Sequence, residues 1–122
     1  MAETIKSRGK KYRQLNRTYL KDAEKMFDNE DFSQASEKLW GAAAEMVKTV
    51  AAKRGVELGT HSSLWDYVSK LDKEHPELML KRDFSYAGNL RQNFYEDWLG
   101  KEDIKEGLEV IKGFIEKLQA LE

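Results

Sequence analysis

An arginine lies inside the apolar face of a predicted helix. The segment AGNLRQNFYEDWL spans residues 87–99, and Arg91 falls among apolar residues that recur there at the spacing of one helix face. These apolar residues are Leu90, Phe94 and Trp98. Burying a guanidinium costs free energy unless an acid pairs with it or it opens onto a cleft. Three roles stay open: an ion pair with Asp83 or Glu45, a side chain that reaches solvent at the helix margin, or a phosphate-binding cleft arginine.

Polar and aromatic residues could complete a small anion-binding cleft around this arginine. His61 follows a loop between two glycines, where it could equally be a cap-region residue. Trp40 and Tyr95 are either core aromatics or rings on which a base stacks. A helical wheel points Asn93 away from the core face, together with Glu96, so a seam between two copies is one way to gather both faces. The candidate ligand-binding residues are Arg91, His61, Asn93, Tyr95, Glu96 and Trp40.

A basic segment over about residues 1–17 is the second candidate site. The first 20 residues carry six basic residues and one acid, whereas the whole chain has a net charge of −1. A basic arm on an acidic body is typical of proteins with an anionic partner, although a solvated helix face has the same pattern. The expected nucleic-acid-binding stripe consists of Lys6, Lys10, Arg13 and Arg17.

Composition limits the classes of protein that remain. The chain has 122 residues, which fits one domain over 1–122, and it has no cysteine, so disulfides and thiol catalysis are excluded. The start of the chain has no apolar run of signal-peptide length, and no segment approaches the roughly 20 apolar residues that cross a bilayer. We expect a soluble, cytoplasmic protein with no membrane partner. Two histidines are too few for a dedicated metal site, no cofactor motif is present, and no complete catalytic set is visible.

Helix-favouring residues dominate the whole chain, which contains a single proline, Pro76. The second predicted helix has the broadest apolar arc, so we place it at the centre, with Leu39 and Met46 buried. Short connections favour antiparallel neighbours. The sequence therefore predicts an all-α, four- to five-helix up-and-down bundle. Its helices are expected over residues 8–28, 32–54, 62–73, 77–99 and 102–121.

Three segments resemble the archaeal PaREP-type proteins, a HEPN-like helical family. They are DFSQASEKLWGAAAEMVKTVAAKRG (31–55), THSSLWDYV (60–68) and AGNLRQNFYEDWL (87–99). The resemblance covers about residues 15–120, and its most specific pieces are EKLWGAA, His61 and NFYE. It implies a HEPN-like bundle that is often a homodimer, in archaea that are mostly thermophiles.

The resemblance also bears on activity. Many HEPN proteins are metal-independent ribonucleases whose motif is an arginine followed, after four to six residues, by a histidine. Arg91 matches the arginine, but Glu96, Asp97 and Trp98 occupy the histidine's positions, and none can take its part at neutral pH. Other HEPN proteins bind nucleotides or pair with a small nucleotidyltransferase.

We therefore expect a non-enzymatic HEPN-like module that binds a nucleotide, a nucleic acid or a partner protein such as a nucleotidyltransferase. Two alternatives stay open. One is a HEPN ribonuclease with an altered site. The other is a protein-interaction bundle, because NEDFSQASEKLWGAAAEM (29–46) also resembles a tetratricopeptide helix.

Overall fold

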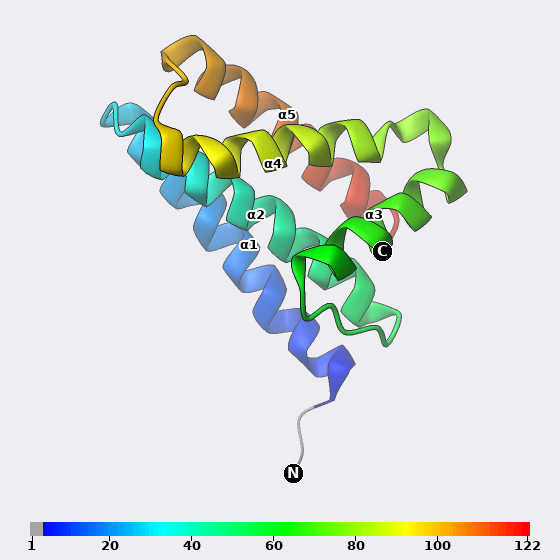
Figure 1. Ribbon diagram of the computed structural model, residues 1–122. Coiled ribbons are helices and arrows are strands. Elements are labelled where there is room, and N and C mark those ends of the chain that lie inside the picture. The colour runs from blue at the N-terminus through cyan, green and yellow to red at the C-terminus, as the bar shows by residue number, and fades with distance from the viewer. Residues whose placement is uncertain (1–3) are drawn as a thin grey trace.

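The computed structural model describes residues 4–122 and folds them into five α-helices without a strand (Figure 1). This confirms the prediction of an all-α bundle. The first three residues of the predicted basic segment lie outside the described part. The helices are α1 (Ile5–Asp28), α2 (Phe32–Lys53), α3 (His61–Glu74), α4 (Leu80–Glu96) and α5 (Lys101–Ala120), with a short 3-10 turn, η1 (Pro76–Leu78), before α4.

Helix α2 forms the centre of the bundle, as predicted. It begins at its N-cap Asp31, whose carboxylate accepts a hydrogen bond from the backbone N–H of Gln34, and Gly55 follows its end with a φ of +76°. Leu39 and Met46 are fully buried, and α2 packs against α1, α3, α4 and α5. The broad apolar arc of the sequence therefore corresponds to a helix that has neighbours on most of its sides.

Figure 1 shows α1 and α2 side by side and antiparallel, while α4 crosses α2 obliquely. The start of α1 therefore lies near the end of α2. Helix α1 begins at Ile5, earlier than predicted, because Thr4 caps it: its hydroxyl accepts from the N–H of Ser7 at 3.0 Å. In the described part of the chain, no helix is long and apolar enough to cross a membrane.

The predicted helix over residues 77–99 was wrong at both ends. Met79 adopts the left-handed conformation, with a φ of 56°, and separates η1 from α4. Asp97 does the same, with a φ of 53°, and its N–H bonds to the carbonyl oxygen of Asn93 at 2.7 Å, so α4 ends at Glu96. Trp98 therefore leaves the predicted core face and is 62% exposed.

Asn93 corrects a second prediction. The wheel pointed it away from the core, yet it is fully buried. Its side-chain amide donates to the hydroxyl of Ser36 at 2.8 Å, and its side-chain oxygen accepts the N–H groups of Trp98 and Leu99, each at 2.8 Å. This one side chain thus joins α4 to α2 and provides the hydrogen-bond acceptor for two backbone N–H groups of the loop after α4.

Candidate functional site

Arg91 lies half-buried between two aromatic rings from different helices. Its guanidinium carbon is 5.9 Å from the centroid of the Trp40 ring and 5.8 Å from that of Tyr95. These distances suit cation–π contacts, which leave the N–H donors at the guanidinium edge available. Within residues 4–122, no carboxylate lies at ion-pair distance from Arg91.

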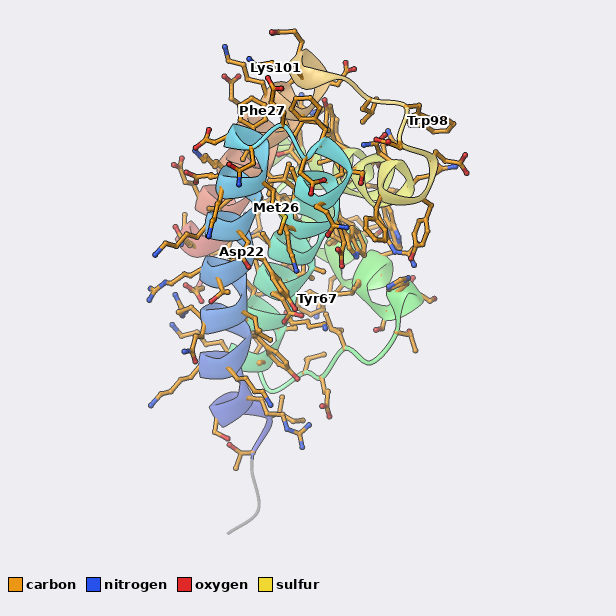
Figure 2. The ribbon with its side chains drawn as sticks, turned by 90° about the vertical axis from the view of Figure 1, so that its left-hand side faces the viewer. Asp22, Met26, Phe27, Tyr67, Trp98 and Lys101 are labelled. Atoms are coloured by element: carbon orange, nitrogen blue, oxygen red, sulfur yellow. The ribbon has the colours of Figure 1, made fainter. Side chains whose placement is uncertain are left out.

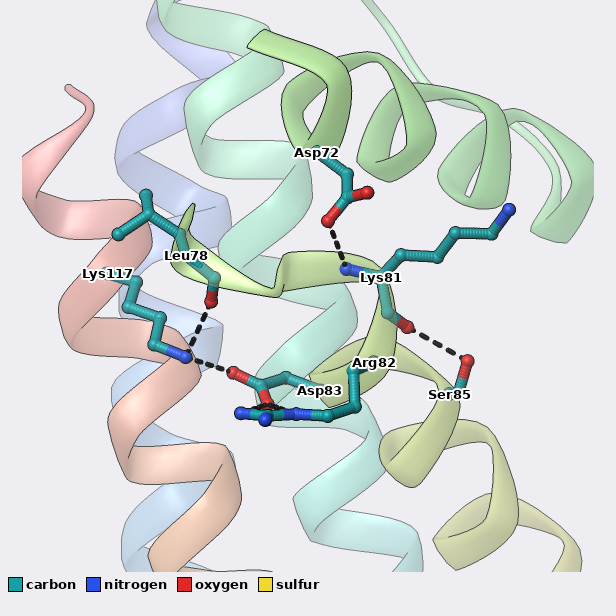
Figure 3. Close-up of polar contacts among 7 residues, drawn as sticks. All are labelled: Asp72, Leu78, Lys81, Arg82, Asp83, Ser85 and Lys117. Atoms are coloured by element: carbon teal, nitrogen blue, oxygen red, sulfur yellow. Dashed lines mark hydrogen bonds and ion pairs between the residues drawn. The ribbon is translucent and has the colours of Figure 1, made fainter. Parts of the chain in front are cut away.

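The two acids considered as partners of Arg91 pair with other cations. Asp83 is 4% exposed and lies 2.7 Å from the ammonium of Lys117 and 3.2 Å from the guanidinium of Arg82 (Figure 3). The Lys117 ammonium also donates to the carbonyl oxygen of Leu78 at 2.7 Å. Glu45 pairs with Lys48 at 3.2 Å. The ion-pair alternative for Arg91 was therefore wrong for both acids.

The Trp40 ring is held in place on the side of the core. Its centroid is 5.4 Å from that of Phe84, which in turn contacts Trp65 at 4.7 Å. The imidazole of His61, at the first residue of α3, lies 5.5 Å from Trp40 at an interplanar angle of 82°. Because its neighbours hold the Trp40 ring in place, this ring offers a fixed surface on which Arg91 and a bound molecule can pack.

Tyr95, which lies on the same helix as Arg91, supplies the second ring of this surface. It is 68% exposed, and its ring meets the half-buried ring of Phe94 edge-on at 5.1 Å. We call Arg91, Trp40, Tyr95 and His61 the Arg91 surface. It combines one permanent charge with exposed aromatic area, which is a composition suited to a phosphate and a stacked base.

The other two predicted ligand-binding residues lie apart from this surface. The polar atoms of Asn93 are engaged inside the bundle, and Glu96 is exposed at the last residue of α4. The sequence also missed Trp98, which the end of α4 releases to solvent. Figure 2 shows Trp98 on the loop over residues 97–100, at the edge of the molecule.

A cavity of about 230 Å³ adjoins the Arg91 surface and shares Trp40 and His61 with it. Glu45 and Lys48 also line it, so its wall carries both signs of charge. Gly41 also lines it, and a Cβ added there would meet the ring of Tyr19 at 2.9 Å. The close approach of α1 to α2 therefore requires a glycine here. In the described residues, no group of three histidines or acids could hold a metal ion.

Three of the four residues of the predicted basic stripe line one cavity, and the fourth does not. Lys6, Lys10 and Arg13 line a second cavity, of about 310 Å³, together with Lys53 of α2. Arg17 is exposed on the same helix but is not part of the lining. The sequence missed Lys53 because it lies far from the stripe along the chain.

One tyrosine that lies outside the Arg91 surface and outside the second cavity has a shifted pKa. The hydroxyl of Tyr86 in α4 donates to the carbonyl oxygen of Asp103 in α5 at 3.3 Å. Burial raises the pKa of Tyr86, and the carboxylates of Glu106 and Asp103 add to that rise. The neutral phenol thus joins α4 to α5 and has a structural role.

A family model described as the Archaeal PaREP1/PaREP8 family matches residues 11–115. No curated protein and no solved structure matches the chain. The matched segment contains the whole Arg91 surface, whereas Lys6 and Lys10 lie before it.

Proposed function

Because the chain belongs to the Archaeal PaREP1/PaREP8 family, we propose that it is a non-enzymatic HEPN-like binding module whose Arg91 surface binds a nucleotide. The five-helix bundle supports the HEPN-like assignment, as does the resemblance of the segment around Arg91. On this proposal the whole chain is one domain.

A single observation carries the proposal: Arg91 has two aromatic neighbours and no carboxylate at ion-pair distance within residues 4–122. The cation–π contacts can fix helix packing without an acid, but they leave the N–H donors at the edge of the guanidinium without a carboxylate partner. The planar fork can instead donate two parallel hydrogen bonds to a phosphate. The exposed face of Tyr95 then offers a place for the base.

Binding is favoured over hydrolysis by the residues that follow Arg91. Glu96, Asp97 and Trp98 stand where the HEPN ribonuclease motif has its histidine, and all three are exposed. An altered-site ribonuclease would need His61 instead, because the fold brings that imidazole to the edge of Trp40. Cleavage of RNA that is lost in His61→Ala would favour this alternative.

A second candidate function, contact with a protein partner, rests on the exposed rings. Tyr95 is 68% exposed and Trp98 62%, and both residue types, with arginine, are enriched at the centres of protein interfaces. The partner can be a second copy, which would make the HEPN-like module a homodimer, or another protein such as a nucleotidyltransferase.

The experiment that tests the nucleotide proposal maps binding on the protein in solution. Adenosine, guanosine, cytidine and uridine monophosphates are titrated separately into ¹⁵N-labelled protein. We expect the largest shifts at the Arg91 side-chain N–H, the Trp40 indole N–H and the amides near His61. Absence of shifts at these groups with all four nucleotides at millimolar concentration would contradict the proposal.

A further inference from the structure

The second cavity described above lies between α1 and α2, and residues of both helices line it. We call it the basic cavity. Lys6, Gly9, Lys10 and Arg13 come from the start of α1, while Thr49 and Lys53 come from the end of α2. The antiparallel packing of these helices brings the two groups together (Figure 1). A stripe along one helix therefore becomes a concave site of about 310 Å³.

The floor of this basic cavity carries no free charge. Thr49 is 2% exposed, and its hydroxyl donates to the carbonyl oxygen of Glu45 at 2.8 Å. Gly9 is buried against Ala52, where an added Cβ would make an ordinary contact at 3.5 Å. The charges are therefore confined to the rim, on flexible side chains.

The rim holds more positive charge than its acidic neighbours neutralise. Arg13 pairs with Glu122, whereas Lys6, Lys10 and Lys53 have no ion pair within the described residues. All three lysines are exposed. Several cations around one concavity repel each other and raise the local concentration of anions.

We propose that the basic cavity binds the terminal phosphates of a small polyphosphorylated group. Lysine ammonium groups bind phosphate as point charges, and two or three of them match a group that carries at least two negative charges. A nucleoside polyphosphate and the 5′ end of an RNA present this same chemistry. The nucleic-acid stripe predicted with Arg17 is a different arrangement, because that residue lies outside the cavity lining.

A structural role for the same lysines has a different signature. Cations at the end of a helix stabilise it through the helix dipole, and Lys53 is the last residue of α2. In that case, replacing Lys53 would lower the melting temperature without any effect on ligand binding. The two roles are therefore separated by measuring both quantities on the same variant.

Inorganic pyrophosphate is the probe, titrated calorimetrically at low salt into the full chain. The test variant is Lys10→Gln/Lys53→Gln, and the matched control is Lys11→Gln/Lys21→Gln, which removes two exposed lysines of α1 outside the cavity. We expect about tenfold or greater weakening in the test variant and less than about twofold in the control. Circular dichroism confirms that both variants remain helical.

Two further arms identify the source of the phosphates. ATP is compared with a short RNA that carries either a 5′-triphosphate or a 5′-hydroxyl, and preference for the triphosphate RNA over ATP would favour an RNA end. The basic-cavity proposal is overturned if pyrophosphate does not saturate, if test and control variants weaken equally, or if only the melting temperature falls. The two proposals fail separately, because the basic cavity is tested by pyrophosphate binding to Lys10→Gln/Lys53→Gln, whereas the Arg91 surface is tested by nucleoside monophosphates and Arg91→Met.

Discussion

The guanidinium carbon of Arg91 lies 5.9 Å from the centroid of the Trp40 ring, and these residues come from α4 and α2. The contact therefore depends on how the two helices pack. The buried side chain of Asn93 joins the same two helices through its hydrogen bond to Ser36. Substitutions can therefore distinguish residues that stabilise the bundle from residues that bind a ligand.

Asn93 belongs to the first group. Asn93→Ala removes three hydrogen bonds and strands the N–H groups of Trp98 and Leu99, so we expect the free energy of unfolding to fall by about 2–4 kcal/mol. The control is Asn89→Ala, an exposed position on the same helix. Urea unfolding followed by circular dichroism measures both. Equal stability of the two variants would show that the buried amide is dispensable.

Lys117 stabilises the buried carboxylate of Asp83. Lys117→Met leaves that carboxylate with Arg82 alone, and we expect a loss of about 3 kcal/mol in unfolding free energy. Lys112→Met on the same helix breaks an exposed pair with Glu24 and should cost less than about 1 kcal/mol. Denaturant midpoints of the two variants provide the comparison. A larger loss in Lys112→Met would reverse the assignment.

Two glycines should respond to alanine with opposite signs. At Gly41 a Cβ would meet the Tyr19 ring at 2.9 Å, so Gly41→Ala should destabilise the fold by about 1–3 kcal/mol. Nothing lies within 4 Å of a Cβ at Gly113, and Gly113→Ala should stabilise α5 by up to about 1 kcal/mol. Thermal unfolding gives the sign of each. A stabilising Gly41→Ala would contradict the close approach of α1 to α2.

The homodimer prediction can be tested at the exposed ring of Trp98. If a second copy covers this ring, light scattering should give a dimer mass for the parent chain, and Trp98→Ser should shift it toward the monomer without loss of helicity. Val56→Ser, at an exposed residue after α2, is the control and should leave the mass unchanged. A parent chain that remains monomeric at high micromolar concentration would count against the homodimer.

The helices could be predicted because apolar periodicity and caps are local signals. Asp31 and Gly55 mark the ends of α2 in the sequence itself, and its broad apolar arc indicates a central position. The end of α4 could not be predicted in this way. A helical wheel assumes that the helix continues until a helix-breaking residue, so it placed Trp98 on the core face. In the structure the helix has already ended at Glu96, because Asp97 adopts the left-handed conformation.

The candidate site could be predicted only in part for a related reason. Arg91 was recognisable as a charge within an apolar stripe, and Trp40 was named as a candidate with it. The contact between these two residues, and the lack of an acidic partner for Arg91, depend on tertiary packing. The helical wheel placed Asn93 outside the core. In the structure its hydrogen bonds to Ser36 and to the loop after α4 hold it inside the bundle, and a wheel does not represent such bonds. Lys53 joined the basic cavity only through the packing of α2 on α1.

The most direct test of the nucleotide proposal is calorimetric titration of nucleoside monophosphates into the parent chain, Arg91→Met and Arg54→Met. The methionine keeps much of the side-chain volume at position 91 and removes the charge, while Arg54 is a surface arginine paired with Glu74. We expect the best-binding nucleotide to lose at least about tenfold in affinity with Arg91→Met, with a similar melting temperature, and to be unaffected by Arg54→Met. Unchanged affinity in Arg91→Met, or no binding of any monophosphate to the parent chain, would contradict it.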